Sequence, residues 1–136
     1  MDTDILSLLW RNHAKVAARV VAAGAEPMAI TMVTYIEVLR GRFASVFTAA
    51  NAAELDLAAE ALAKSRKKLD ELRVVEFNDT VSKQFDQLLM NKKLKKMGRP
   101  DMLNACFALV YGATLVTRNT KDYANIPGLK LENWAD

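Results

Sequence analysis

Residues 27–37 read PMAITMVTYIE and join a short apolar run directly to a helix signal. The run over residues 28–33 is uncharged and partly β-branched, which is typical of a buried parallel strand. Thr34 and Glu37 have the spacing of a capping box, so we predict that a helix starts at Thr34 and ends near Gly41. A strand that leads straight into a helix favours an α/β fold.

The same alternation of strands and helices continues along the chain. We expect one or two helices over residues 5–23, further helices over residues 52–72, 81–89 and 101–111, and strands over residues 73–77, 114–117 and 129–134, the last at a sheet edge. A basic loop over residues 91–100 precedes the last of these helices. The pattern predicts a single domain over residues 1–136, an α/β sandwich around a mostly parallel sheet.

The composition and the start of the chain suggest in which cellular compartment the protein resides. The 136 residues are 51% hydrophobic, which is enough for a core of ordinary size. Cys106 is the only cysteine, so we expect a core thiol without an internal disulfide. The start, MDTD, is acidic where a secretory signal is basic, and the longest uncharged apolar stretch is roughly half the ~20 residues that span a membrane. We therefore expect a soluble cytoplasmic protein with no membrane partner.

Two clusters of basic residues are more informative than the net charge of +3. Clustered bases favour a phosphate backbone, and the alternative is a solvated helix face. We leave both roles open for the first cluster and favour the solvated face for the second. The first comprises Lys92, Lys93, Lys95, Lys96 and Arg99, and the second comprises Lys64, Arg66, Lys67 and Lys68.

Acidic residues follow the predicted strands. Glu37 comes after the strand at 28–33, and Asp122 comes after the strand at 114–117 together with Asn119. Asp101 opens a helix that runs back toward the same carboxyl edge of the sheet, where sites form in parallel sheets. Asp2 fits only if a first strand ends there, and Met1 alone precedes it. That strand is either very short, or includes residues 3–5, or begins upstream.

Acids that meet at one edge need a cation. Two carboxylates about 4 Å apart repel by roughly 4 kcal/mol at an effective dielectric constant near 20. Oxygen ligands suit Mg²⁺ or Mn²⁺, whereas one histidine and one cysteine are too few for a zinc site. A bound divalent ion can deprotonate water and neutralise charge on a phosphate, so no side-chain nucleophile is required.

Each acid also has a purely structural alternative. Glu37 could serve only as the capping partner of Thr34, Asp101 could only balance a helix N-terminus, Asn119 and Asp122 could be a second cap pair, and Asp2 could belong to a frayed terminus. Among the other polar and aromatic residues, His13 is expected at a helix end, Trp10 and Trp134 in packing, and Arg42 in either surface pairing or phosphate contact.

Four segments of the chain resemble, in order and in spacing, the signature segments of PIN-domain proteins. They are Met1–Leu6, Thr34–Gly41, Arg99–Ala105 and Leu115–Tyr123, and the end of the chain, Pro127–Trp134, is similar to that of bacterial VapC-type toxins. The resemblance covers nearly the whole chain. It implies a three-layer α/β/α sandwich with a parallel central sheet.

The resemblance also implies a site and an activity. Asp2, Glu37, Asp101 and Asp122 would bind Mg²⁺, with Mn²⁺ as a substitute, and Asn119 would orient them. The protein would be a toxin that cleaves RNA, often tRNA or ribosomal RNA, is inhibited by a cognate antitoxin and usually forms a homodimer. The family commonly has Asn where Asp4 stands, and we expect Asp4 to cap the first helix. Candidate contacts to RNA phosphates are Arg40, Arg118, Lys92, Lys93, Lys95 and Lys96, and the four lysines rest on charge alone.

Three other functions remain open. The first is a PIN nuclease for RNA processing or for DNA without a toxin role, and a neighbouring antitoxin gene would argue against it. The second is a PIN-like binding module without catalysis, which a lack of Mg²⁺ and Mn²⁺ binding would favour. The third is a purely structural partner subunit.

Overall fold

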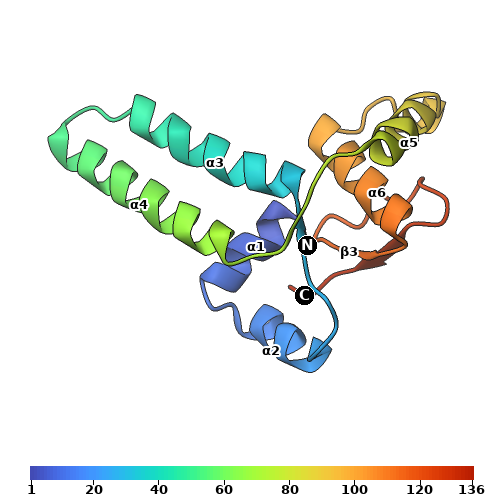
Figure 1. The fold of residues 1–136 in the computed structure, drawn as a ribbon, viewed down its shortest axis with the longest axis horizontal. Coiled ribbons are helices and arrows are strands. Elements are labelled where there is room, and N and C mark those ends of the chain that lie inside the picture. Colours follow the sequence, from blue (N-terminus) through green and yellow to red (C-terminus); the bar gives the residue numbers. More distant parts are fainter.

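The computed structural model describes residues 1–136, and Figure 1 shows helices and short strands alternating along the chain. The helices are α1 (Thr3–Trp10), α2 (Ala14–Ala23), α3 (Met32–Phe47), α4 (Ala52–Asp70), α5 (Asp79–Leu89) and α6 (Arg99–Tyr111), with a 3₁₀ turn η1 (Lys92–Leu94) before α6. The strands are β1 (Ile30–Thr31), β2 (Val74–Val75), β3 (Thr114–Val116) and β4 (Lys130–Glu132). The predicted α/β class is confirmed.

All the strand pairing is parallel, as the sequence predicts. In the first sheet β1 pairs with β2 and Ile30 lies opposite Val74. In the second sheet β3 pairs with β4 and Thr114 lies opposite Lys130. The two pairs form separate two-stranded sheets rather than one continuous sheet. The central sheet of the molecule is therefore divided between β1 and β3.

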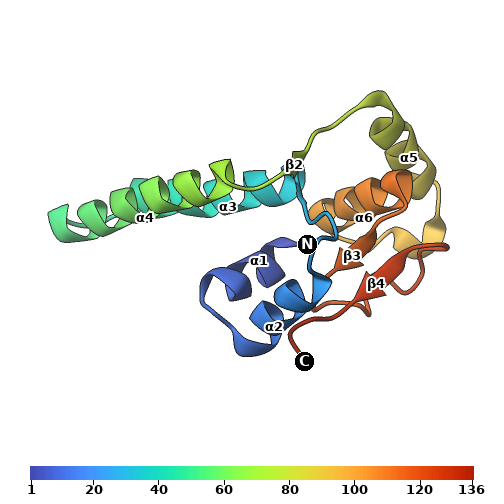
Figure 2. The same ribbon diagram turned by 60° about the horizontal axis from the view of Figure 1, so that its bottom comes forward.

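Successive residues of β3 face opposite layers of helices. Leu115 belongs to a core cluster with Val81 of α5 and Phe107 of α6. Val116 belongs to a second cluster with Ile5 of α1 and residues of α2. Because side chains alternate across a strand, helices cover both faces of β3, which is the α/β/α layering that the family resemblance implies. Figure 2 shows α6 beside β3 and β4, with α1 and α2 on another side of them.

Helix α3 starts earlier than its capping-box pattern predicts. Its N-cap is Thr31, whose hydroxyl oxygen accepts a hydrogen bond of 3.2 Å from the Thr34 amide. Thr34 is fully buried, and its hydroxyl donates to the Met1 carbonyl oxygen at 3.4 Å. The prediction that Thr34 caps a helix with Glu37 as its partner is therefore wrong, and the strand at 28–33 is shortened to Ile30–Thr31.

Helix α3 also ends later than predicted, at Phe47 rather than near Gly41. Figure 1 shows α3 and α4 side by side as an arm that extends away from the sheets. The Arg42 side chain of α3 donates a hydrogen bond of 2.8 Å to the hydroxyl of Ser65, a buried residue of α4. A glycine within a helix costs only about 1 kcal/mol, and packing against α4 compensates for that cost at Gly41.

The remaining helix boundaries agree with their sequence signals. Asn51 and Asn78 cap α4 and α5 by accepting hydrogen bonds from the amides of Glu54 and Val81. Pro100 lies in the first turn of α6, and Gly112 ends that helix with a left-handed φ of 58°. Cys106 is fully buried, as predicted. No helix has both the length and the apolar character that crossing a membrane requires.

Candidate metal centre

Asp2 lies where the two sheets approach each other. The Met1 amino group donates to the Ala29 carbonyl oxygen at 2.9 Å, and the Asp2 amide donates to the Val116 carbonyl oxygen at 3.0 Å. The Asp2 carboxylate accepts a hydrogen bond of 3.0 Å from the Ile5 amide and so caps α1. Asp2 is therefore fixed rather than frayed.

The cap of α1 corrects one expectation. We predicted that Asp4 caps this helix, but the capping side chain is that of Asp2, and Asp4 is an exposed residue of the first turn. Burial raises the pKa of the Asp2 carboxyl, and the charge of Asp4 adds to the effect. Hydrogen bonds from the Ile5 amide and the Thr117 side chain oppose that rise.

Glu37 reaches the start of α1 from α3. Its carboxylate accepts a hydrogen bond of 2.5 Å from the Thr3 hydroxyl, and Thr3 directly follows Asp2. Because Glu37 does not act as a capping partner, the structural alternative considered for it does not apply. The early start of α3 places Glu37 in the second helical turn, on the side that faces α1.

Asp101 lies in the first turn of α6, and a buried tyrosine holds it. The Tyr123 hydroxyl donates to the Asp101 carboxylate at 3.0 Å, and the tyrosine is only 1% exposed. Burial raises the pKa of Tyr123, and the charges of Asp101, Asp2 and Glu37 raise it further. The charges of three acids, from α3, α6 and the chain start, thus act on one hydroxyl group, which stays protonated at neutral pH.

Asp122 is connected to the other acids through a chain of hydrogen bonds rather than directly. Its carboxylate accepts a hydrogen bond from the Asn119 side chain, and the Asn119 amide donates to the Thr117 hydroxyl at 3.1 Å. Thr117 is fully buried at the end of β3, and its side chain also hydrogen-bonds Asp2. Asp122 itself is exposed, so the structure places it at the outer side of the site.

Each of the three acids other than Asp2 accepts a hydrogen bond from a hydroxyl or amide side chain. Thr3 binds Glu37, Tyr123 binds Asp101, and Asn119 binds Asp122. No three acidic, histidine or cysteine side chains are close enough together to hold a metal ion as the side chains stand. Carboxylates repel one another strongly without a cation, which accounts for the intervening donors. The donor set is oxygen alone, and it fits Mg²⁺ or Mn²⁺.

Sequence reasoning missed two residues of this site. Tyr123 directly follows Asp122, so its position next to a predicted acid could have marked it as a candidate residue of the site. Thr117 ends a predicted strand, where a hydroxyl side chain can reach the carboxyl edge of the sheet. Both are buried and bind predicted acids, so they set the geometry of the site.

Some of the basic side chains contact other residues of the protein, and others are exposed to solvent. Lys64 pairs with Glu60 at 2.7 Å and Lys68 lies over the Trp10 ring, which agrees with a surface role for the second cluster. Arg42 binds Ser65, and Arg99 lies over the Phe85 ring. The other candidates for phosphate contact are exposed: Arg40, Arg118, Lys92, Lys93, Lys95 and Lys96. The four lysines lie in and after η1, just before the helix turn that carries Asp101.

Comparison with known proteins identifies the family. The family model of the PIN domain matches residues 1–129, so the chain belongs to the PIN domain family. It is similar to Ribonuclease VapC1 of Haemophilus influenzae (strain R2866), with 26% identity over 140 residues that cover 98% of this chain and 96% of the relative.

Two solved structures share the fold. One is the structure of VapBC-1 from nontypeable Haemophilus influenzae, with a TM-score of 0.76, 23% identity, and coverage of 99% of this chain and 96% of that one. The other is VapBC2 from Rickettsia felis bound to a DNA fragment from their promoter, also with a TM-score of 0.76 and 23% identity, covering 98% of this chain and 96% of that one.

Proposed function

We propose that this protein is a divalent-metal-dependent endoribonuclease and the toxin of a toxin–antitoxin pair. The observation that carries the proposal is that the Tyr123 hydroxyl donates to Asp101 and its pKa is also raised by the charges of Asp2 and Glu37, with Asp122 linked through Asn119 and Thr117. The relative named Ribonuclease VapC1 supports RNA as the substrate.

The four acids would hold Mg²⁺ or Mn²⁺. When bound, the ion would supply a hydroxide equivalent at neutral pH and neutralise the charge that develops on the phosphate. The protein's own residues prepare the site. Thr3 and Tyr123 orient Glu37 and Asp101, Asn119 orients Asp122, and the backbone bonds of Met1 and Asp2 fix the start of the chain. The exposed bases Arg40 and Arg118 would meet the RNA phosphates.

The test replaces Asp101 with Asn. This substitution removes one ligand charge but keeps the size of the side chain and its capacity to accept from Tyr123. We expect RNA cleavage to fall by more than about 100-fold, beyond the 10- to 100-fold loss that is typical of residues that only position a ligand.

Asp86→Asn is the matched control, because Asp86 is an exposed acid of α5 on the outside of the molecule. Cleavage of RNA by the Asp101→Asn protein at the rate of the control would refute the catalytic assignment. Cleavage of single-stranded DNA in preference to RNA would move the proposal to a DNA-acting nuclease.

An antitoxin would bind over the same site. Several large apolar side chains on the arm are exposed, including Ile36, Phe43, Phe47 and Leu57. They lie on the helices next to Glu37, and an acidic pocket attracts a basic side chain of a partner. One solved structure with the same fold, from Klebsiella pneumoniae, is described as a toxin–antitoxin complex. Purified partner should suppress cleavage at equimolar concentration, and unchanged cleavage in a stable complex would contradict this mode of inhibition.

The exposed apolar surface also favours a homodimer. Phe43 and Phe47, four residues apart on the same helix of the arm, are 45% and 86% exposed, and neighbouring exposed apolar side chains are typical of protein interaction sites. The molar mass in solution, measured by light scattering, should be twice the monomer mass of 15.1 kDa. A monomer at all concentrations would contradict the homodimer.

A further inference from the structure

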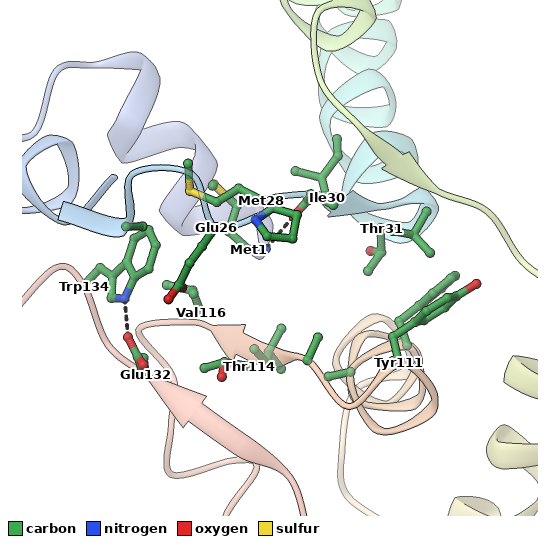
Figure 3. Close-up of a pocket in the computed structure, with 18 residues that line it drawn as sticks. Met1, Glu26, Met28, Ile30, Thr31, Tyr111, Thr114, Val116, Glu132 and Trp134 are labelled. Carbon is green, nitrogen blue, oxygen red and sulfur yellow. Dashed lines mark hydrogen bonds between the residues drawn. The ribbon is translucent and has the colours of Figure 1, made fainter. Parts of the chain in front are cut away.

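A mostly apolar slot of about 450 Å³ separates the two sheets (Figure 3). Thr31 lies on one wall of the slot, and Thr114 and Val116 lie on the other. No strand pairing crosses from β1 to β3. The two halves of the molecule, which we define as residues 27–75 and residues 78–136, are therefore not joined through a sheet.

One side-chain hydrogen bond joins these two halves directly. The Thr31 hydroxyl donates to the Asn104 carboxamide oxygen at 2.6 Å, across 73 residues of the chain. No other hydrogen bond or ion pair links the two halves. Apolar contacts also connect them, since Val33 of α3 and Met102 of α6 share a core cluster, but such contacts are not directional. The Thr31–Asn104 bond is therefore the one directional contact between α3 and α6.

Both partners of this bond are held firmly on their own helices. Thr31 caps α3, because its hydroxyl oxygen also accepts a hydrogen bond of 3.2 Å from the Thr34 amide. Asn104 is only 2% exposed and lies three residues after Asp101 in α6, so the two side chains project from the same face of that helix. A buried carboxamide without a partner is costly, so the bond to Thr31 is expected to persist in solution.

The acids of the proposed metal site divide between the same two halves. Glu37 belongs to α3 in the first half, whereas Asp101 of α6 and Asp122 belong to the second. The ligands of a metal ion must be held within about 0.5 Å of their coordinating positions. A shift of α3 relative to α6 would separate Glu37 from Asp101 without altering either side chain. The only directional contact between these helices is thus placed where it can set that separation.

We propose that Thr31 and Asn104 form a clamp that sets the spacing of Glu37 and Asp101, and through it the affinity of the site for Mg²⁺ or Mn²⁺. Both are positioning residues, since neither side chain hydrogen-bonds an acid of the site. The clamp rests on the metal site proposed above and adds a requirement to it. The alternative is a buried polar pair that only stabilises the fold.

The test measures the Kd for Mn²⁺ by calorimetry and the stability by urea unfolding, both on the full chain. Asn104→Leu removes the acceptor and leaves the cap of α3 intact, and Thr31→Val removes the donor. The double variant replaces the pair with apolar side chains of similar size, an exchange that can leave stability nearly unchanged. In all three we expect the Kd for Mn²⁺ to rise by about 10- to 100-fold, as when other side chains that support metal ligands are removed.

The size of the effect in the double variant identifies a shared bond. Because each single substitution breaks the same hydrogen bond, the double variant should bind Mn²⁺ no more weakly than the weaker of the two single variants. A pair that only stabilises the fold would change the urea midpoint and leave the Kd for Mn²⁺ as it is.

Two further variants separate positioning from a general loss of stability. Thr31→Ser keeps both the cap and the donor, so it should retain the original Kd for Mn²⁺. Asn51→Ala removes the cap of α4, at the far end of the arm in Figure 1, and should lower the stability without changing the Kd. A loss of Mn²⁺ affinity in Thr31→Ser as large as that in Thr31→Val would overturn the clamp.

The double variant decides between the remaining outcomes. An unchanged Kd for Mn²⁺ would overturn the clamp, and so would a Kd raised by the product of the two single effects, since the residues would then act independently. The Asp101→Asn protein is measured beside it. Lost binding in Asp101→Asn with unchanged binding in the double variant would leave the metal site without the clamp. Unchanged binding in Asp101→Asn would overturn the metal site itself and the clamp with it.

Discussion

Tyr123 shows how a single hydroxyl group organises the acidic site. It is buried, it donates to Asp101, and the charges of three carboxylates raise its pKa. Its raised pKa keeps it protonated at neutral pH, so it remains a donor there. The residue therefore positions Asp101 and does not exchange protons with the substrate.

Replacing Tyr123 with Phe removes this donor and leaves the ring in the core. We expect the free energy of unfolding to fall by about 1.5–3 kcal/mol, the range for a hydrogen bond to a charged group. We expect RNA cleavage to fall by about 10- to 100-fold, as for other residues that orient metal ligands. Denaturant unfolding and initial cleavage rates measure the two effects.

Tyr111→Phe is the control for this variant. Tyr111 is an exposed residue at the opposite end of α6 from Asp101, and its hydroxyl accepts a hydrogen bond of 2.9 Å from the Asn78 side chain. This variant should keep its cleavage rate. Equal cleavage by both variants would show that Tyr123 does not position Asp101.

Asp2 should make the metal-free protein less stable as the pH rises. Its pKa is raised above 3.8, chiefly by burial, so the folded state favours the neutral carboxyl. Ionised Asp2 therefore destabilises the fold above its folded-state pKa, and this effect disappears as the pH falls below the unfolded-state value.

Asp2→Asn keeps a side chain that caps α1 and removes the charge. In EDTA we expect this variant to be at least as stable as the original at pH 7, with the difference vanishing near pH 4. Urea unfolding across this pH range checks the expectation. A variant that is less stable than the original at pH 7 would show that the ionised carboxylate stabilises the fold.

Three of the four candidate acids have a local signal in the sequence, because Glu37 and Asp122 follow predicted strands and Asp101 opens a predicted helix, whereas Asp2 has only Met1 before it. The side chains that bind these acids were not predictable from local sequence signals. The contact between Glu37 and Thr3 depends on α3 starting at Met32, and a capping box at Thr34 was the stronger local signal. Thr31 competes for the same cap and prevails because Thr34 is buried against Met1, a contact 33 residues away in the chain.

At the scale of elements, η1 and the loop after it form the most exposed basic segment near the site. Lys92, Lys93, Lys95 and Lys96 are all exposed, and Leu94 between them is buried and anchors the turn. The segment leads into the first turn of α6, which carries Asp101. RNA that reaches Asp101 would pass along these lysines.

Replacing these four lysines with Gln should weaken RNA binding in a salt-dependent way. The slope of log K against log salt concentration should decrease by up to about 3, since each phosphate contact to a single strand contributes about 0.7. Binding titrations from 50 to 300 mM KCl, with the metal replaced by Ca²⁺, measure the slope.

The matched control replaces Lys64, Arg66, Lys67 and Lys68 of α4 with Gln. It removes the same total charge from the arm, where Lys64 and Lys68 already have partners. In the control variant, the slope of log K against log salt concentration should change little. An equal change in both variants would mean that net charge, and not the η1 segment, governs RNA binding.

Helix positions were more predictable than strand lengths. The boundaries of α4, α5 and α6 lie within two residues of the ranges that the sequence predicts, because each helix has local cap or stop residues. The strands are only two or three residues long, because each is limited by a helix cap or a pairing partner that lies far away in the chain. Local patterns do not contain that information.

For the whole molecule, the division of the sheet is the feature that the sequence could only suggest. The alternation of elements predicted parallel pairing, and both strand pairs are parallel. The short start before Asp2 left the first strand in question, and the structure shows a slot at that place. The arm of α3 and α4 was also not predicted, since Gly41 marked an earlier helix end.

The central claim is that acids from separate segments hold one divalent-metal site. The most direct measurement is an anomalous difference map from crystals of the protein soaked in Mn²⁺. We predict a peak coordinated by Asp101 and Asp2, with Glu37 or Asp122 beside it, and no peak in crystals of the Asp101→Asn protein. A Mn²⁺ peak away from these carboxylates, or none at millimolar Mn²⁺, would contradict the account.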